Sequence, residues 1–178
     1  AINEKYDLIR NELRQNSTIE EMAISGSAVT RAFITNGGLD WEGRPDDMQN
    51  QFWSIRVSHD FGETIGWEVV EGRDFSREFG TDSMALVSNE AAVKYMGLED
   101  LVGKKMTWGG NGDYTIIGVV KNMVMQSPYT AQNQMFFVLD YNRSSNTIIK
   151  INPRANPQDA LATLESTFKK YDPNNPFE

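Results

Sequence analysis

Apolar residues recur at helical spacing near both ends of the 178-residue chain. The first stripe predicts a helix over residues 3–15, with Asn3 as N-cap and a buried face formed by Tyr6, Ile9 and Leu13. The second predicts a helix that starts after Asn156 and buries Leu161, Leu164, Phe168 and Tyr171. A strand is predicted beside each helix, over residues 18–26 and 147–151.

In the middle of the chain, short apolar runs and the alternation of apolar with polar residues predict strands over residues 51–58, 84–87 and 134–139. A short helix is predicted over residues 90–96, because Asn89 is a suitable N-cap and Gly97 suits the left-handed position after a helix. A hairpin is predicted around Asn111-Gly112, since both residues tolerate positive φ. The polar segment 27–50 is predicted to form turns.

The order of the elements is mirrored at the two ends, helix then strand at the start and strand then helix at the end. This order predicts an α+β fold with a split β-α-β unit at each end and a central mixed β/α subdomain. We expect residues 1–178 to form a single domain, with subdomains 1–35 plus 141–178 and 36–140. Each end unit lacks its outer strand, which we expect outside the chain or partly at Phe177.

Composition narrows the function classes. The chain has 17 basic and 25 acidic residues, and its net charge of −8 argues against a nucleic-acid partner. It has no cysteine, which excludes disulfides, thiolate catalysis and cysteine zinc sites, and its single histidine is His59. No apolar run has the length of a membrane span and no signal peptide is recognisable, so we expect a segment cut from a longer protein.

Several groups of residues suggest chemistry but lack the spacing that it needs. Gly109 to Gly112 precedes a strand, whereas a phosphate loop opens a helix, so a hairpin turn is predicted. The carboxylates of Glu68, Glu71 and Asp74 are predicted to be solvated or paired with Arg73. A second acidic group consists of Asp40, Glu42, Asp46 and Asp47. The spacing of these residues does not match that of a calcium-binding loop.

The remaining candidates are also predicted to be structural. His59 follows Ser58 directly, which is poor geometry for a nucleophile and its base, so it is predicted to be a turn histidine. Core packing is predicted for Met123 to Met125 and for the four tryptophans Trp41, Trp53, Trp67 and Trp108. The sequence therefore predicts no catalytic, cofactor-binding or metal-binding residue, and no enzyme.

An ordered series of short segments points to a family. It comprises Glu71-Gly72-Arg73-Asp74-Phe75-Ser76, then Ala85-Leu86-Val87-Ser88-Asn89-Glu90-Ala91-Ala92, then Met96-Gly97, then Val102-Gly103-Lys104, and last Asp113-Tyr114-Thr115-Ile116-Ile117-Gly118-Val119-Val120-Lys121. This series resembles the extracytoplasmic core domain of MacB/FtsX-type ABC transporter permeases, which carry hxxGRxF, VxNEAA, GKxhxh and IxGVV (h, apolar) in this order. The resemblance is good over residues 50–125, and elsewhere it rests on element order.

The resemblance implies a place between the first and second transmembrane helices of a four-helix permease, on the periplasmic side of the bacterial inner membrane. It implies a non-catalytic mechanical transmitter without a cofactor, which couples cytoplasmic ATP hydrolysis to export or to control of a periplasmic partner. The partners implied are the permease's own transmembrane helices, the cytoplasmic ATPase subunit, a second permease copy, and a periplasmic adaptor or cargo.

Two other functions compete with this interpretation. The chain is alternatively a free-standing secreted or periplasmic ligand-binding module that uses its tryptophans and acidic surface. A hydrolase is the third hypothesis, and it requires a buried carboxylate pair in a deep pocket, with the pKa of one carboxyl raised.

Overall fold

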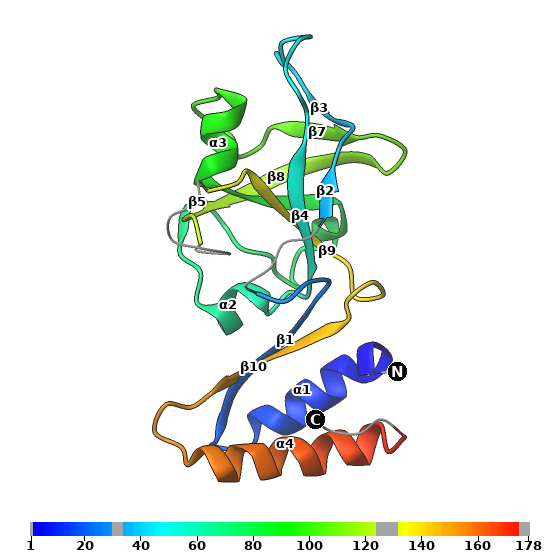
Figure 1. The fold of residues 1–178 in the computed structure, drawn as a ribbon, viewed down its shortest axis with the longest axis vertical. Helices are drawn as coiled ribbons and strands as arrows, with labels where there is room; N and C mark the ends of the chain where they lie inside the picture. Colours follow the sequence, from blue (N-terminus) through cyan, green and yellow to red (C-terminus); the bar gives the residue numbers. More distant parts are fainter. Residues whose placement is uncertain (1, 30–33, 124–131, 175–178) are drawn as a thin grey trace.

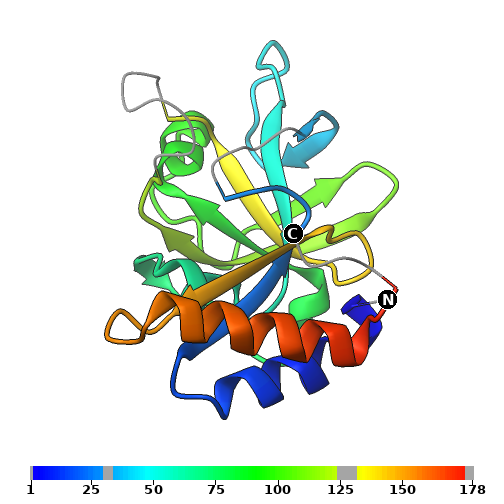
Figure 2. The ribbon, with the colours of Figure 1, turned by 60° about the horizontal axis from the view of Figure 1, so that its bottom comes forward.

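The computed structural model describes residues 2–29, 34–123 and 132–174. The first and last elements of the chain form one end of the molecule (Figure 1). We call this end the end layer; it consists of α1 (Tyr6–Arg14), β1 (Ile19–Ser25), β10 (Asn146–Ile151) and α4 (Pro157–Tyr171). Helices α1 and α4 lie side by side and pack on the ribbon of β1 and β10 (Figure 2).

All other elements form what we call the central body. Its helical segments are α2 (Phe61–Ile65), the 3₁₀ helix η2 (Gly80–Met84) and α3 (Glu90–Met96). Its strands are β2 (Ile34–Asn36), β3 (Leu39–Trp41), β4 (Phe52–Val57), β5 (Val69–Gly72), β6 (Ala85–Asn89), β7 (Lys105–Trp108), β8 (Gly112–Val120) and β9 (Met135–Leu139). A further 3₁₀ turn, η1 (Ile2–Lys5), precedes α1 in the end layer.

One mixed sheet runs through both parts, in the strand order β10-β1-β4-β9-β6-β8-β7-β3. Strand β2 pairs with β4, and β5 pairs with β8. The β4–β9 and β6–β8 pairs are parallel, whereas β1–β10, β6–β9 and β7–β8 are antiparallel. The fold is therefore α+β with a mixed sheet, as the sequence predicts.

The sheet is narrow where the end layer meets the central body. Strands β1 and β4 share a single register pair, Ser25 with Val57. Two backbone hydrogen bonds flank this pair, from Gly26 N to Arg56 O (2.8 Å) and from Ser58 N to Ile24 O (3.0 Å). Because so few backbone bonds connect the two parts, side chains must supply much of the junction.

Three apolar clusters fill the molecule. One belongs to the end layer and centres on fully buried residues of α1, β1 and α4, among them Ile9, Leu13, Met22 and Ala160. The other two lie on opposite faces of β6 in the central body: Leu86 belongs to one cluster and Val87 to the other. The cluster of Val87 also includes Ala23 of β1, so it reaches into the end layer. Alternation along a strand produces this division, since neighbouring side chains point to opposite faces.

Most predicted elements are confirmed, and their caps explain why. Asn89 Oδ1 accepts a hydrogen bond from Ala92 N (3.0 Å), and Gly97 ends α3 with φ +67°. Asn156 Oδ1 accepts from Gln158 N (2.8 Å) at the start of α4. In each case a side chain or a glycine satisfies the backbone groups that a helix end leaves free, so the boundary is encoded locally.

Four details of the sequence prediction are wrong. The first α-helix begins at Tyr6, after a 3₁₀ turn, so Asn3 is not its N-cap and instead donates to Ser144 O. Leu161 is 50% exposed, and Ala160 takes its place against the end-layer core. In the hairpin turn, positive φ occurs at the glycines and not at Asn111. The segment predicted to form turns also holds the strands β2 and β3. The expected outer strand at Phe177 lies outside the described residues.

Candidate functional site

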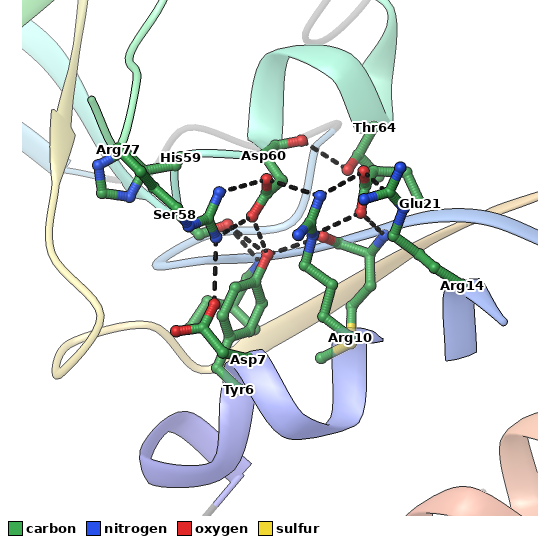
Figure 3. A network of polar contacts seen from close by, with 12 residues as sticks. Tyr6, Asp7, Arg10, Arg14, Glu21, Ser58, His59, Asp60, Thr64 and Arg77 are labelled. Atoms are coloured by element: carbon green, nitrogen blue, oxygen red, sulfur yellow. Dashed lines mark hydrogen bonds and ion pairs between the residues drawn. The ribbon is translucent and has the colours of Figure 1, made fainter. Parts of the chain in front are cut away.

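A network of polar side chains, buried at its centre and exposed at its edges, lies between α1 and the start of α2 (Figure 3). It draws on α1, β1, the β4–α2 connection and the segment after β5, so it joins the end layer to the central body. We call it the junction network; its members are Tyr6, Asp7, Arg10, Arg14, Glu21, Ser58, Asp60 and Arg77. It lies where the sheet is narrowest.

Asp60 is the centre of the network. The Arg77 guanidinium donates two hydrogen bonds to it, from Nη1 to Oδ1 (2.7 Å) and from Nη2 to Oδ2 (2.6 Å). Arg10 Nη2 lies 3.0 Å from the Oδ1 atom of the same carboxylate. Burial acts to raise the pKa of Asp60, but hydrogen bonds from Arg77 and Tyr6 and the two cationic charges outweigh it and lower this pKa. Asp60 is therefore ionised, although only 6% of it is exposed.

Arg10 joins Asp60 to a second buried carboxylate, Glu21. Arg10 donates from Nε to Oε1 and from Nη2 to Oε2 of Glu21, both at 2.7 Å. Arg14 Nε lies 3.4 Å from Glu21 Oε2, and Met22 N donates to Oε1 (2.9 Å). Glu21 is 1% exposed, so these partners replace the water that its charge has lost.

The Tyr6 hydroxyl connects α1 to β1 and to the segment between β4 and α2. It lies 2.7 Å from Met22 O, 2.8 Å from Asp60 Oδ2 and 3.2 Å from Ser58 Oγ. Ser58 Oγ also accepts a hydrogen bond from Ile24 N (3.1 Å). Burial raises the pKa of Tyr6, so the hydroxyl keeps its proton at physiological pH and acts as a neutral link.

The charges of the junction network balance. Three guanidiniums, of Arg10, Arg14 and Arg77, face three carboxylates, of Asp7, Glu21 and Asp60. Paired buried ions tolerate little displacement, because separating them leaves a charge without water or counter-ion. This arrangement can hold two parts of a protein in one geometry. At its centre the Asp60 carboxylate is ionised and the Tyr6 hydroxyl is neutral.

His59 lies at the edge of this network. Its Nδ1 is 2.6 Å from the Tyr141 hydroxyl, and its backbone N donates to the same oxygen (3.2 Å). Burial and the nearby charge of Arg77 lower the pKa of His59, so the imidazole is neutral at pH 7. Tyr141 also packs edge-on against Tyr6, with ring centroids 5.3 Å apart. Ser58 points to Tyr6 and the β1 backbone, where its hydroxyl is already bonded.

The carboxylates of the 68–74 segment lie in different environments. Glu68 pairs with Lys121 at the surface (2.7 Å). Arg73 pairs with Asp82 rather than with Asp74. Asp74 accepts hydrogen bonds from Trp67 Nε1 (2.8 Å) and from Phe75 N (2.6 Å). Burial raises the pKa of Asp74 to about 6, an effect that these two hydrogen bonds only partly offset. The expectation that Asp74 is solvated or paired with Arg73 is therefore wrong.

We predict that Asp74→Asn gains stability relative to the natural chain as pH rises. The raised pKa means that folding favours the protonated acid, so the stabilisation is complete below about pH 4 and is lost as pH rises through about 6. Asparagine stays neutral and avoids this loss. Between pH 4 and pH 8 the difference in unfolding free energy should move by about 2–3 kcal/mol in favour of the variant. Urea unfolding at steps of one pH unit measures it.

Asp46 provides the matched control, because it is exposed and acidic. The Asp46→Asn variant should follow the natural chain across the whole pH range. The fluorescence of Trp67, which donates to Asp74, should report the same titration directly. A constant difference between Asp74→Asn and the natural chain from pH 4 to pH 8 contradicts the assignment.

The structure also shows where the acidic residues, tryptophans and methionines singled out in the sequence lie. Within the described residues no group of three or more histidine or acidic side chains could hold a metal ion. Asp40 pairs with Arg44 at 2.7 Å. Trp41 and Trp108 are buried in the central body, and Trp53 and Trp67 pack against its other cluster, which confirms core packing. Met123 packs there too, whereas residues 124 and 125 lie outside the described residues.

Sequence reasoning missed the junction network. One signal for it exists: Arg10 falls four positions after Tyr6 and three before Leu13, so a charge lies on the predicted buried face. Such a charge needs a buried partner. Nothing in the sequence indicates that Glu21 and Asp60 supply it, because they lie 11 and 50 positions away.

Solved structures share this fold. The periplasmic region of MacB from Actinobacillus actinomycetemcomitans matches with a TM-score of 0.62 and 15% identity, over 93% of this chain and 73% of that chain. A domain described as a permease from Porphyromonas gingivalis matches with a TM-score of 0.63, 14% identity and coverages of 92% and 69%. The extracellular domain of the noncanonic ABC-type transporter YknZ from Gram-positive bacteria matches with a TM-score of 0.63 and 14% identity, over 94% of this chain and 82% of that chain. The fold is thus one found in outer domains of ABC transporters.

The family follows from the sequence itself. The family model for the MacB-like periplasmic core domain matches residues 3–167. The chain belongs to this family, and it is a periplasmic domain of a MacB-like ABC transporter permease. The resemblance noted over residues 50–125 is confirmed, and the family match covers residues 3–167. A search of curated proteins finds no match. In the described part of the chain, no helix has both the length and the apolar character that a membrane crossing requires.

Proposed function

We propose that this domain is a non-catalytic mechanical transmitter on the periplasmic side of the bacterial inner membrane. It couples ATP hydrolysis by a cytoplasmic ATPase subunit to export, or to control of a periplasmic partner. The end layer receives movement from the transmembrane helices of the permease. The central body meets a second permease copy, an adaptor or the cargo.

The junction network is the observation that supports this function most directly. A transmitter needs a stiff connection between the part that is moved and the part that acts. Arg10 and Tyr6 of the end layer both contact Asp60, whose other guanidinium partner is Arg77 of the central body. The covalent and sheet connections at this point are few, so these ion pairs carry the coupling together with the packing of Ala23 and Ile148 against the central apolar cluster.

The arrangement of the two terminal helices supports attachment at one end. Lys5 Nζ donates to Tyr171 O (2.8 Å), so the start of α1 lies beside the end of α4. Glu12 binds both Lys170 Nζ (2.7 Å) and the Tyr171 hydroxyl (2.6 Å), which ties the helices together. A domain inserted between two neighbouring transmembrane helices requires its two ends to be adjacent in this way.

The test uses spin labels in the complete permease with its ATPase. This chain has no cysteine, so once any cysteines elsewhere in the complex are replaced, single labels can be placed on the end layer at Arg154→Cys and on the central body at Asp46→Cys, both exposed positions. Distances between the two permease copies are then measured with and without ATP. We expect both labels to move together. With Asp60→Asn added, the label at 154 should still move, while the distribution at 46 broadens and no longer follows it.

The alternative, a free-standing binding module, predicts different results. The parent reading frame would then encode a cleavable signal and a stop codon soon after Glu178, rather than apolar segments of about 20 residues on both sides. No ATP-dependent distance change at either label, in a permease that hydrolyses ATP, would falsify the transmitter function.

A further inference from the structure

A cleft of about 310 Å³ opens between the β7–β8 hairpin and the loop that follows β9. Both segments lie on the same side of the molecule (Figures 1 and 2). Its polar lining consists of Arg56, Asn111, Tyr114, Asp140, Asn142 and Arg143. The cleft is separate from the junction network and is mostly polar, which distinguishes it from a gap in the apolar core.

The arginines of this cleft are poorly satisfied. The side chain of Arg56 is only 19% exposed, yet its nearest carboxylate contact is 3.3 Å, from Nε to Asp140 Oδ2. Arg143 approaches the same oxygen at 4.0 Å and is 72% exposed. Within the described part of the chain neither guanidinium makes a hydrogen bond beyond these contacts. Each guanidinium carries five N–H donors, so most of them are free to bind a ligand.

The charge of the lining favours an anion with one negative charge. Two guanidiniums face a single carboxylate, which leaves one positive charge in excess, although the whole chain carries −8. Asp140 Oδ1 is occupied by the backbone N–H groups of Asn142 (3.0 Å) and Arg143 (3.2 Å), so its position is fixed. A doubly charged phosphate would meet repulsion from Asp140, whereas a carboxylate compensates the excess charge and fits the planar guanidinium fork.

We propose that this cleft binds a carboxylate group, with Arg56 and Arg143 as its main ligands. Asn111 and Asn142 supply further hydrogen bonds at its sides. The carboxylate belongs either to a small acid or to an acidic peptide. The loop that holds Asp140 and Arg143 also carries Tyr141, which contacts Tyr6 and His59, so a bound carboxylate touches the same loop that enters the junction network.

The experiment is a titration of the 15N-labelled chain, followed by amide chemical shifts. The probes are N-acetylalanine, its neutral amide N-acetylalaninamide, inorganic phosphate, and acetyl-Ala-Glu-Ala-amide, whose only carboxylate is a side chain. We expect saturable shifts at Asn111, Asn142 and Arg143 with the two carboxylate probes only. Tighter binding of N-acetylalanine indicates a small acid or a chain terminus, and tighter binding of acetyl-Ala-Glu-Ala-amide indicates an acidic side chain.

Variants test the assignment of the ligands. Arg56→Gln should weaken carboxylate binding at least about tenfold, because it removes a charged hydrogen-bond donor. The exposed Arg143→Gln, which has little effect on folding, should weaken it about threefold to tenfold. Arg154→Gln is the control: it removes an exposed arginine elsewhere and should leave the affinity unchanged. Equal binding of the neutral amide, tighter binding of phosphate, or full affinity in both cleft variants overturns the proposal.

Discussion

Replacing Asp60 by asparagine is expected to lower the free energy of unfolding by about 3–5 kcal/mol, the range for breaking a buried ion pair from one side. Asparagine has the same shape, but it leaves Arg77 and Arg10 without the charge that their guanidiniums now face. Both cations are partly or largely buried, so water cannot fully replace the carboxylate. Urea unfolding followed by circular dichroism measures the change.

Asp40→Asn is the matched control for this experiment. Asp40 also binds an arginine at 2.7 Å, but its side chain is 60% exposed. Exposed pairs contribute little, so the loss should be much smaller than that of Asp60→Asn. The pKa of Asp60 is lower in the folded protein than in the unfolded chain, which adds a pH dependence. The contribution of Asp60 to the free energy of unfolding is present above the pKa of the unfolded chain and is lost as the pH falls through the pKa of the folded protein. Equal losses in the two variants would mean that burial does not strengthen the junction network.

The second large effect is expected for Gly72→Ala. Gly72 has φ +70°, and an added Cβ would lie 2.2 Å from Ile117 O on the paired strand β8. The substitution combines left-handed backbone strain of about 1–2 kcal/mol with a steric conflict of about 1–3 kcal/mol. We expect unfolding to become easier by about 3 kcal/mol, measured by urea or thermal unfolding.

Gly97→Ala separates the two causes. Gly97 has nearly the same dihedral, φ +67°, but a Cβ added there would meet no atom of a neighbouring segment within 4 Å. Its alanine variant should therefore lose only the backbone contribution, about 1 kcal/mol. Similar losses at the two positions would show that the close approach of β5 to β8 is easily relaxed.

Local signals account for what the sequence could predict. The helix over 90–96 was predictable because Asn89 and Gly97 determine its ends without help from the rest of the fold. The predicted buried face of the first helix is correct for the same reason, since Tyr6, Ile9 and Leu13 form one stripe. The family could be recognised because its segments occur in order along the chain.

Non-local contacts account for what the sequence could not predict. Strands β2 and β3 have three residues each, and they exist because β4 and β7 pair with them. Leu161 fits the apolar period of α4, but the helix is rotated so that Ala160 and Leu164 face the core. Asp60 and Arg77 lie in turns far apart in the sequence and bind each other, and the packing of α1 adds Tyr6 and Arg10 to Asp60.

The pairing of β1 with β10 also determines when the domain can be completed during synthesis. Ser25 pairs with Asn146, so this ladder closes a loop of about 120 residues. The apolar stripe of α1 finds its helical neighbour only after α4 has been made. Until β10 and α4 have been made, β1 lacks one of its two strand partners and α1 lacks its helical neighbour, so both depend on their contacts with the central body.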